Sequence, residues 1–392
     1  NKDESEHTEE ITFITSNTSI PDKIISNGIP PQIKHQSKHI ENIPSVTSNS
    51  NTAENKDESG HSEDIISNSI PPQIKDEADH TEDIAFVLSN GIPPENFTRD
   101  TSAFPIDNLP LNDSSQLLNI TNFKFLINTP CSESAYIVVV HSAPSNYHKR
   151  QLIRSTWGSK VPLYFFFGET ATNQALLDTE STAYHDIVQG SFIDSYRNLT
   201  YKDMLVFKWV IYNCPRVRYV LKIDDDVFVN VARFSEFLTD ALSPYGTRHL
   251  LMCYVWRHIA VDRSNNMSKF YVSVEEYPYE EYPPYCSGPT VLYSPDVLFK
   301  LYQSLQQDGN YFWIEDVFVT GIMVSKLNLK HAEFNWWKGN DWLLVTKYED
   351  LFQYDPGRNL FVMIGEPIYE QNGQNLVEYF LNVTSDHSGN PV

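Results

Sequence analysis

The strongest constraint on the fold is a set of short, nearly continuous apolar runs that alternate with helical patterns. Runs of this length that end in turn residues are typical of buried strands. Between them, Leu205, Trp209 and Tyr212 recur at helical spacing, and Thr200 with Asp203 resembles a capping box at the start of that helix. Strands alternating with helices predict an α/β fold with a mostly parallel central sheet flanked by helices. The predicted strands are 135–144, 161–168, 218–223 and 249–256, and the other predicted helices are 148–157 and 231–242.

The first part of the chain has a different character, because it contains a degenerate polar repeat. NKDES occurs at 1–5 and again at 55–59, and ISNGIPPQIK at 25–34 returns as ISNSIPPQIK at 66–75. Units this polar and this often interrupted by proline cannot bury a core, so they predict a disordered spacer. A solenoid would need a periodic apolar face in each unit, and the repeat has none. We therefore predict a disordered acidic spacer over 1–122 and a folded domain over 123–392.

The charge distribution limits the class of partner. The formal net charge is −22; residues 1–100 carry 19 acidic and 7 basic side chains (−12), which leaves 32 and 22 (−10) for the rest. The chain has no basic stripe, which argues against a nucleic-acid partner. No stretch approaches the roughly 18 apolar residues that span a membrane. The sequence begins with Asn1 rather than Met, so a signal or anchor upstream stays open.

Glycosylation acceptors and cysteines bear on the compartment. Seven N-x-S/T sites favour a protein of the secretory pathway. The chain has four cysteines and no CxxC pair, which argues against a zinc site. Their even number permits two disulfides, with three possible connectivities. The acceptor sites are Asn17, Asn96, Asn112, Asn119, Asn198, Asn266 and Asn382, and the cysteines are Cys131, Cys214, Cys253 and Cys286.

The segment YVLKIDDDVFVN, residues 219–230, places three consecutive aspartates at the end of a predicted buried strand. If the strand geometry continues, Asp224 and Asp226 share one side and Asp225 faces the other. Two partly buried carboxylates on one side need raised pKa values or a cation. A hard divalent ion such as Mn²⁺ or Mg²⁺ suits such oxygen ligands, above all if phosphates complete its shell. The alternative is a solvated turn that caps the next helix.

This acidic segment resembles the D-x-D-type motif of the β-1,3-glycosyltransferases, the galactosyltransferase and N-acetylglucosaminyltransferase family with a GT-A fold. Four further segments resemble the same family in the same order, and together the resemblance covers about residues 123–350. The segments are RQLIRSTWG (150–158), DSYRNLTYK (194–202), YPPYCSGPTVLYSPDV (282–297) and WIEDVFVTG (313–321).

The resemblance implies a reaction in which a sugar passes from a UDP-sugar to a hydroxyl of an acceptor glycan, with inversion. It implies that Asp226 is a direct ligand of Mn²⁺ or Mg²⁺, with Asp224 and Asp225 supporting the ion or holding the donor's ribose and sugar hydroxyls. Asp316 is the implied base, and Glu315 is either an alternative base or a residue that positions the acceptor. The start of a helix at EDV is expected to keep Asp316 ionised. Alternatively, both carboxylates only satisfy helix amides.

Three cationic side chains and one glycine are candidates for donor binding. Arg150 and Arg154 lie four residues apart, on one face of a helix, and can clamp the diphosphate or uracil with help from Lys202. Ordinary surface pairing is the alternative for both arginines. Gly288 permits a close approach of the backbone to the donor sugar, or else it is a plain turn glycine.

The match to the family has two departures. Thr290 and Val291 stand where members commonly carry glycine and tyrosine, and Trp336 stands at a position where a histidine often binds the metal. His331 can replace that ligand if its loop is rearranged, or it is a surface histidine. The positions of the cysteines in this fold lead us to expect the pairs Cys253–Cys286 and Cys131–Cys214.

Two functions follow from these patterns. The first is a luminal, metal-dependent β-1,3-glycosyltransferase of the Golgi membrane that acts on a glycoprotein or glycolipid acceptor. Its catalytic domain would be 123–392, and its acidic spacer would be a stem below an upstream type II signal-anchor. The second is a catalytically weak or inactive glycan-binding relative, which the missing histidine favours. A metal-dependent phosphohydrolase would need a second metal site, and the sequence offers none.

Overall fold

The computed structural model describes residues 103–170, 174–334, 342–345 and 361–364. The chain divides into two units at Ile65 and Ile66, and all described residues belong to the second unit. The repeat-containing part of the predicted spacer, residues 1–102, therefore lies outside the described residues, and its predicted disorder stays a prediction. No described helix is both long and apolar enough to cross a membrane.

An eight-stranded sheet forms the centre of the second unit, with the strand order β11-β9-β10-β7-β4-β5-β6-β3. Its middle strands β7, β4, β5 and β6 run parallel to one another. β10 is antiparallel to β7 and β9, β3 is antiparallel to β6, and β11 is parallel to β9. The predicted α/β class with a mostly parallel sheet is thus confirmed. The strands are β3 (Phe125–Asn128), β4 (Tyr136–His141), β5 (Leu163–Glu169), β6 (Ile187–Ile193), β7 (Tyr219–Asp224), β9 (Leu251–Trp256), β10 (Tyr285–Tyr293) and β11 (Ala332–Glu333).

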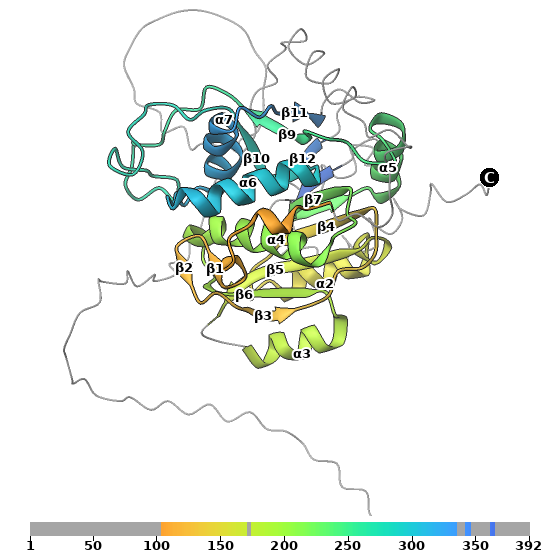
Figure 1. Cartoon of the computed structure of the whole chain (residues 1–392). Coiled ribbons are helices and arrows are strands. Elements are labelled where there is room, and N and C mark those ends of the chain that lie inside the picture. The colour runs from red at the N-terminus through yellow and green to blue at the C-terminus, as the bar shows by residue number, and fades with distance from the viewer. Residues whose placement is uncertain (1–102, 171–173, 335–341, 346–360, 365–392) are drawn as a thin grey trace, which may run out of the picture. The chain divides into compact units, whose positions relative to one another are not determined.

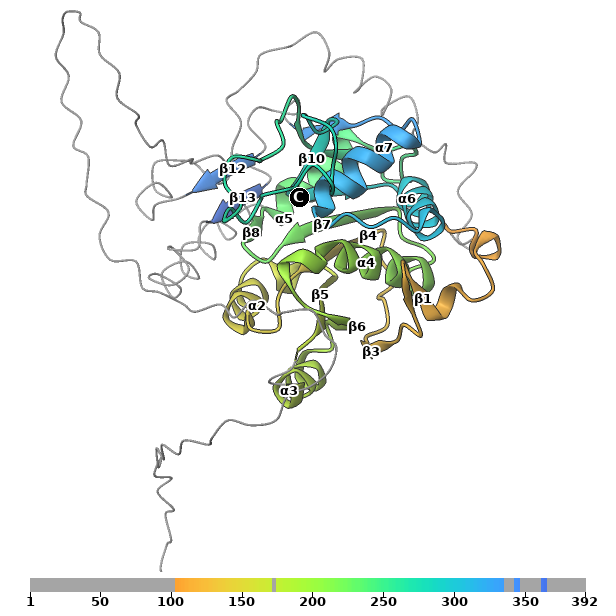
Figure 2. The same cartoon turned by 90° about the vertical axis from the view of Figure 1, so that its left-hand side faces the viewer.

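Helices cover both faces of this sheet, as the two views show (Figure 1, Figure 2). Alternate residues of one strand enter different cores because successive side chains point to opposite faces. Val139 belongs to the core that contains Trp209 of α4, whereas Val138 belongs to the core that contains Ile153 of α2. Both valines are fully buried. The helices are α2 (Tyr147–Ser155), α3 (Gln174–Tyr184), α4 (Leu199–Asn213), α5 (Val231–Glu236), α6 (Pro295–Asp308) and α7 (Met323–Lys326), with π-helical turns η6 (Phe237–Ala241) and η7 (Asp316–Ile322).

The predicted capping box at the start of α4 is wrong. The helix begins two residues earlier, at Leu199, and its N-cap is Asn198 rather than Thr200. The hydroxyl of Thr200 donates to the carbonyl of Phe312 at 2.7 Å rather than to its own helix. Asp203 is buried beside His141 and takes no part in a cap. Both side chains make contacts with distant residues of the core instead of capping the helix.

Residues 103–122, which we assigned to the spacer, belong to the folded domain. They form the helical turns η2 (Ile106–Asn108) and η3 (Asp113–Ser115) and a hairpin of β1 (Gln116–Leu117) and β2 (Ile120–Thr121). Asp113 is 2% exposed and accepts hydrogen bonds from the hydroxyls of Tyr212 and Tyr302, each at 2.8 Å, and pairs with Lys208 at 3.2 Å. This segment is therefore fastened to α4 and α6, and the expected start of order near Phe123 is too late.

A second sheet lies next to the acidic triplet. It has the order β12-β13-β8, where β8 (Val227–Val229) directly follows Asp226. β13 (Phe361–Ile364) pairs antiparallel with β8 and parallel with β12 (Trp342–Val345). The turn that carries Asp225 and Asp226 is consequently held between a strand of each sheet.

Both expected disulfides are confirmed. Cys131 pairs with Cys214 at the end of α4, across a sequence separation of 83 residues. Cys253 of β9 pairs with Cys286 of β10, across a separation of 33 residues. The second bond ties β10 to its neighbour two residues before Gly288, close to the site described below.

Removal of the first disulfide should destabilise the domain. In the double substitution Cys131→Ala with Cys214→Ala, the unfolded chain regains the freedom of an 83-residue loop. We expect a loss of about 4 kcal/mol in the free energy of unfolding, measured by denaturant titration and extrapolated to water with the m-value fitted separately for each protein. An unchanged denaturation midpoint would show that this bond does not stabilise the fold.

Candidate active site

The predicted functional residues gather at the carboxyl edge of the parallel strands. β4 ends at His141, and its neighbour β7 ends at Asp224 in register with it. In sheets of this kind, ligands bind just outside the carboxyl ends of the strands. Beyond the sheet, the turn at Glu315 and Asp316 packs beside β10, which adds two further carboxylates.

A buried lysine holds this acidic group together. Lys222 lies two residues before Asp224 on the same face of β7 and is 2% exposed. Its Nζ donates to the carbonyl of Gly288 at 2.8 Å and lies 3.6 Å from Oδ1 of Asp224. Burial opposes its charge, but the surrounding carboxylates outweigh burial and raise the pKa of Lys222, so it stays protonated. These carboxylates are Asp224, Asp203, Glu315 and Asp316.

Lys222 was not among the predicted site residues, although the sequence contains a signal for it. A charged residue in the middle of the apolar run YVLKI is costly to bury unless it is paired. Alternation along the strand places Lys222 on the same side as Asp224. The pair could therefore have been found without a structure.

Glu315 and Asp316 face Gly288 across a gap that a side chain would narrow. A methyl group built on Gly288 would lie 3.5 Å from Oε1 of Glu315 and 3.8 Å from Oδ2 of Asp316. The predicted contact of Gly288 with a donor sugar stays untested, but the glycine leaves room in front of both carboxylates. It also supplies the carbonyl that receives Lys222.

The helix terminus favours the ionised form of Asp316, as expected, but burial opposes it more strongly. The amide of Val317 does donate to Oδ1 at 2.8 Å, which favours the carboxylate. However, removal from water and then the negative charge of Glu315 raise the pKa of Asp316 well above its usual range. Burial likewise raises the pKa of Glu315, against the opposing effect of Lys222. Both carboxyl groups are therefore more basic than ordinary ones.

Asp225 lies in the turn that follows β7, so the strand geometry that the alternation prediction required ends at Asp224. It is 5% exposed and accepts hydrogen bonds from Ser142 Oγ at 2.7 Å and Asn146 Nδ2 at 2.9 Å. Lys149 lies 3.4 Å from its other oxygen. Asp225 thus anchors the loop between β4 and α2 to the acidic turn, and these contacts leave it little exposed to a donor.

The two arginines do not form the predicted clamp. Arg150 is fully buried and bonds both oxygens of Glu180, at 2.8 and 2.7 Å. Arg154 binds Glu180 at 2.7 Å and both oxygens of Asp186 at 2.7 Å. Surface pairing, the alternative considered, is also wrong for Arg150, because its partners are internal. It supports the site indirectly, since it donates to Ser142 Oγ at 3.1 Å, and that hydroxyl in turn donates to Asp225.

Lys202 lies near the same edge, but its ammonium group is occupied by bonds to other residues of the protein. Its Nζ donates to the carbonyl of Ser142 at 2.6 Å and pairs with Asp194 at 3.1 Å. Asp194 also accepts the amide of Gly168 at 2.7 Å, so this pair joins the ends of β4, β5 and β6. Its side chain is only 4% exposed, so Lys202 is not presented for direct contact with a donor.

A buried pair beneath the site was not anticipated. Nε2 of His141 lies 3.2 Å from Oδ1 of Asp203, and both side chains are 4% exposed. Burial raises the pKa of Asp203 to about 7. Burial, followed by the charges of Lys222 and Lys202, lowers the pKa of His141 well below its usual range. The histidine is therefore neutral at physiological pH.

The fit to a divalent cation rests on Asp224 and Asp226. Both are half-buried at the sheet edge, and both offer the oxygen ligands that hard cations prefer. Within the described ranges, no group of three or more His, Cys, Asp or Glu is arranged to hold a metal. A cation held at this edge would therefore take only one or two protein carboxylates and complete its shell with phosphate oxygens.

His331, the expected replacement for the missing metal ligand, contacts the backbone instead of a metal site. Nε2 of His331 lies 2.7 Å from the carbonyl of Thr320 in η7, and burial lowers the pKa of the ring. This contact commits the ring to the neighbouring turn rather than to a metal.

Trp336 lies outside the described residues. Thr290, which with Val291 forms the first departure from the family pattern, is 3% exposed, so its side chain faces inward.

The glycosylation acceptors within the described residues differ in exposure. Asn112, Asn119 and Asn266 are exposed, whereas Asn198 is half-buried and its Nδ2 donates to the carbonyl of Ile193 at 2.7 Å. Asn17, Asn96 and Asn382 lie outside the described residues. Glycosylation at all seven stays a prediction.

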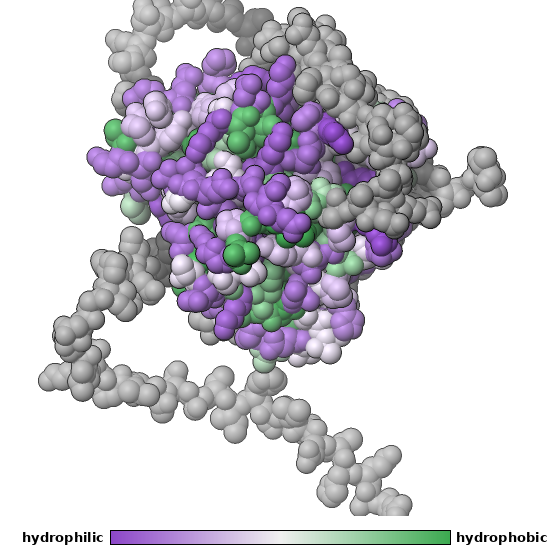
Figure 3. Space-filling model, in the orientation of Figure 1, coloured by the Kyte–Doolittle hydropathy of each residue, from purple (hydrophilic) through white to green (hydrophobic). Residues whose placement is uncertain are grey.

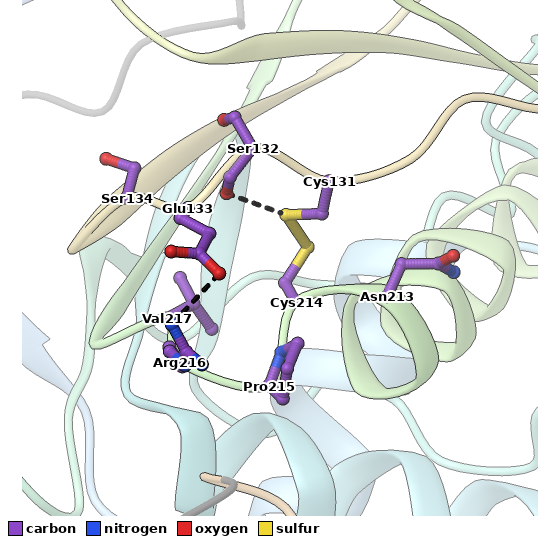
Figure 4. Close-up of a pocket in the computed structure, with 9 residues that line it drawn as sticks. All are labelled: Cys131, Ser132, Glu133, Ser134, Asn213, Cys214, Pro215, Arg216 and Val217. Carbon is purple, nitrogen blue, oxygen red and sulfur yellow. Dashed lines mark hydrogen bonds and ion pairs between the residues drawn. A yellow bond between two sulfur atoms is a disulfide. The ribbon is translucent and has the colours of Figure 1, made fainter. Parts of the chain in front are cut away.

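A small pocket lies at the other edge of the sheet (Figure 4). It surrounds the disulfide of Cys131 and Cys214 and includes Glu133, which pairs with Arg216 at 2.9 Å. Its lining residues precede β4 and β7, and a strand of this length places them about 20 Å from the acidic edge. The pocket is thus separate from the candidate active site.

Comparison with known proteins identifies the family. Residues 148–335 match the sequence profile of the family described as Galactosyltransferase. Beta-1,3-galactosyltransferase 5 of Homo sapiens is 32% identical over 225 residues, which cover 55% of this chain and 71% of that protein. Beta-1,3-galactosyltransferase 1 of Mus musculus is 30% identical over 276 residues, which cover 62% of this chain and 82% of that protein.

Among solved structures, a glycosyltransferase involved in the glycosylation of the major capsid of PBCV-1 matches 63% of this chain and 99% of its own. Its identity is 12% and its TM-score is 0.33. A TM-score this low supports no argument about the site. The sequence matches do bear on the site, because the matched residues include the acidic triplet, Gly288, Glu315 and Asp316. The chain belongs to the galactosyltransferase family of glycosyltransferases.

Proposed function

We propose that this chain transfers a hexose or N-acetylhexosamine from a UDP-sugar to a glycan acceptor, in β-1,3 linkage and with a divalent cation. The observation that carries the proposal is the meeting of Asp224, Glu315 and Asp316 around Lys222 and Gly288 at the carboxyl edge of the sheet. Family membership supports transfer of a sugar, and the names of the relatives support the β-1,3 linkage.

In this mechanism Asp316 is the base. A carboxylate with an ordinary pKa is a weak acceptor of an alcohol proton, and a base works best when its pKa approaches the working pH. Burial and Glu315 move the pKa of Asp316 in that direction. One oxygen of Asp316 takes the acceptor hydroxyl's proton as that hydroxyl attacks the sugar. The Val317 amide fixes the carboxylate through its other oxygen.

The remaining residues position the donor side of the reaction. Lys222 keeps Asp224 and Glu315 from repelling each other at close range, and Gly288 leaves the space in front of the carboxylates open. Asp226 and Asp224 would hold Mn²⁺ or Mg²⁺, which offsets the charge of the departing UDP. Arg150 and Asp225 keep the loop before α2 in place and thereby fix one wall of the site.

The proposed setting is the Golgi lumen, with the chain held by a membrane anchor upstream and its acceptor carried by a glycoprotein or glycolipid. Two disulfides that use all four cysteines support an oxidising compartment. The exposed acceptors Asn112, Asn119 and Asn266 support passage through the secretory pathway.

The proposal is tested by incubating the full chain with UDP-galactose, UDP-N-acetylglucosamine or UDP-N-acetylgalactosamine and a panel of neutral glycans. We expect one donor to give a product one sugar longer, detected by mass spectrometry, with Mn²⁺ or Mg²⁺ present. EDTA should abolish product formation, and re-addition of the metal should restore it. If every donor yields no product while glycans still bind, the chain is a glycan-binding relative instead.

A further inference from the structure

Three aromatic rings form a cluster beside the candidate active site. The ring of Tyr196, in η5 (Tyr196–Asn198), lies 6.5 Å from that of Phe270 and 6.1 Å from that of Trp313. The three residues come from separate segments, namely the loop after β6, the connection between β9 and β10, and the turn before η7. The fold has therefore brought together aromatic side chains that sequence proximity does not explain.

Two of these rings face solvent, which distinguishes them from core residues. Tyr196 is 47% exposed and Phe270 is 50% exposed, whereas Trp313 is 5% exposed and forms the floor of the cluster. Hydrophobic side chains are visible at the left margin of the space-filling view, where Figure 1 shows the connection between β9 and β10 (Figure 3). Large apolar groups exposed together mark binding sites more often than isolated ones do.

The segment that carries Phe270 is held in place by internal contacts. Arg263 donates to the carbonyls of Val272 at 2.6 Å, Tyr277 at 2.6 Å and Tyr279 at 2.9 Å. Ala260 and Glu281 form a bridge that closes the base of the segment. The exposed ring of Phe270 is thus presented by a fixed frame, and its exposure is not the result of a loose loop.

The aromatic cluster is continuous with the acidic site. Burial is the main cause of the raised pKa of Tyr196, and the charges of Glu315, Asp316 and Asp224 add to it, so its hydroxyl lies in their field. Trp313 precedes Glu315 by two residues in the chain. Its Nε1 is buried and has no hydrogen-bond partner within the part of the chain that the structure describes.

The surrounding charge favours an uncharged occupant. The connection between β9 and β10, residues 257–284, carries five acidic and three basic side chains, so its net charge is −2. Two cations already lie over the rings, namely Lys269 over Phe270 and Tyr196, at 4.7 and 5.7 Å, and Arg197 over Trp313, at 4.3 Å. Arg197 also pairs with Glu276 of the connection at 3.3 Å, and the connection together with Arg197 still carries an acidic excess of −1. An anionic sugar would meet this acidic surface, whereas a neutral sugar can place its apolar C–H face on the exposed rings.

We propose that Tyr196, Phe270 and Trp313 form the subsite that holds a neutral sugar of the acceptor glycan. The sugar's apolar face packs on Tyr196 and Phe270, above Trp313, and one of its hydroxyls reaches the phenol of Tyr196. This placement sets the attacking hydroxyl next to Glu315 and Asp316. The inference rests on the proposed function, because it assigns the acceptor to that same site.

The test is a comparison of Phe270→Ala with Met267→Ala in the full chain. Met267 is 85% exposed on the same segment and lies outside the ring cluster, so it controls for loss of apolar surface alone. Phe270→Ala should raise the acceptor KM about 3- to 10-fold and leave the donor KM unchanged. Met267→Ala should leave both constants unchanged. Phe270→Trp keeps an aromatic ring at this position and should have an acceptor KM close to that of wild type.

A direct binding measurement separates this inference from the proposed reaction. Lactose, N-acetyllactosamine and chitobiose are titrated by saturation-transfer NMR without any donor, next to a sialylated trisaccharide. We expect a neutral disaccharide to bind, and to bind about 3- to 10-fold more weakly to Phe270→Ala. Binding without transfer would refute the proposed reaction and keep the subsite. Equal binding by wild type and Phe270→Ala, or a preference for the sialylated probe, would overturn the subsite.

Discussion

Replacement of Asp316 by asparagine is expected to lower kcat for sugar transfer by about 10²- to 10⁴-fold, the usual contribution of a general base. The amide is nearly the same size, so it keeps the space in front of Gly288, but it cannot take the acceptor's proton. The acceptor KM should change little, because the asparagine side chain retains hydrogen-bonding atoms. The measurement is initial-rate kinetics with the donor that gives product.

Two comparisons make this result specific. Asp178→Asn changes an exposed carboxyl on α3 and should leave kcat within about twofold of wild type, as expected for a surface change away from the site. Glu315→Gln tests the alternative base that the sequence left open. If Glu315→Gln removes activity and Asp316→Asn does not, the roles of the two residues must be exchanged.

Replacement of Lys222 by methionine should be the most damaging change to the site's electrostatics. The side chain is buried, and its loss leaves Asp224, Glu315, Asp316 and Asp203 without their shared cation. Removal of one partner from a buried ion pair typically costs about 3–5 kcal/mol. We expect that loss in the free energy of unfolding, measured by denaturant titration, together with a loss of sugar transfer.

A second buried lysine separates the two effects. Lys208 is fully buried on α4 and pairs with Asp113, away from the acidic edge. Lys208→Met should also destabilise the fold, but the folded fraction should keep its donor and acceptor KM values.

Addition of Asp224→Asn to Lys222→Met should recover part of the lost stability. No recovery in this double variant would contradict the pairing of Lys222 with Asp224.

The α/β class and the strands that carry the site could be predicted because their signals are local. The apolar runs that became β4, β5 and β7 are long enough to be buried on both faces, and the helical repeat around Trp209 is regular. The acidic triplet falls at the end of β7 for the same reason. The disulfide pairs followed once the cysteines were placed on the fold that the resemblance implied.

The parts that could not be predicted depend on contacts between distant residues. Arg150 resembles a surface cation in the sequence, and only the packing of α3 against α2 shows that Glu180 neutralises it. Residues 103–122 look like spacer because their polar anchor, Asp113, is satisfied by residues about 100 to 190 positions later. The basicity of Asp316 depends on how far the fold removes it from water, which a sequence motif does not record.

The central claim is that this acidic edge transfers a sugar, and the most direct test compares wild type with Asp316→Asn in one transfer assay. Each protein is incubated with Mn²⁺, a UDP-sugar and a neutral glycan, and the product is isolated and its linkage determined by NMR. The account predicts a β-1,3-linked product from wild type and a rate lower by about 100-fold or more from the variant. Equal rates from the two proteins, or a product with the retained α configuration, would contradict it.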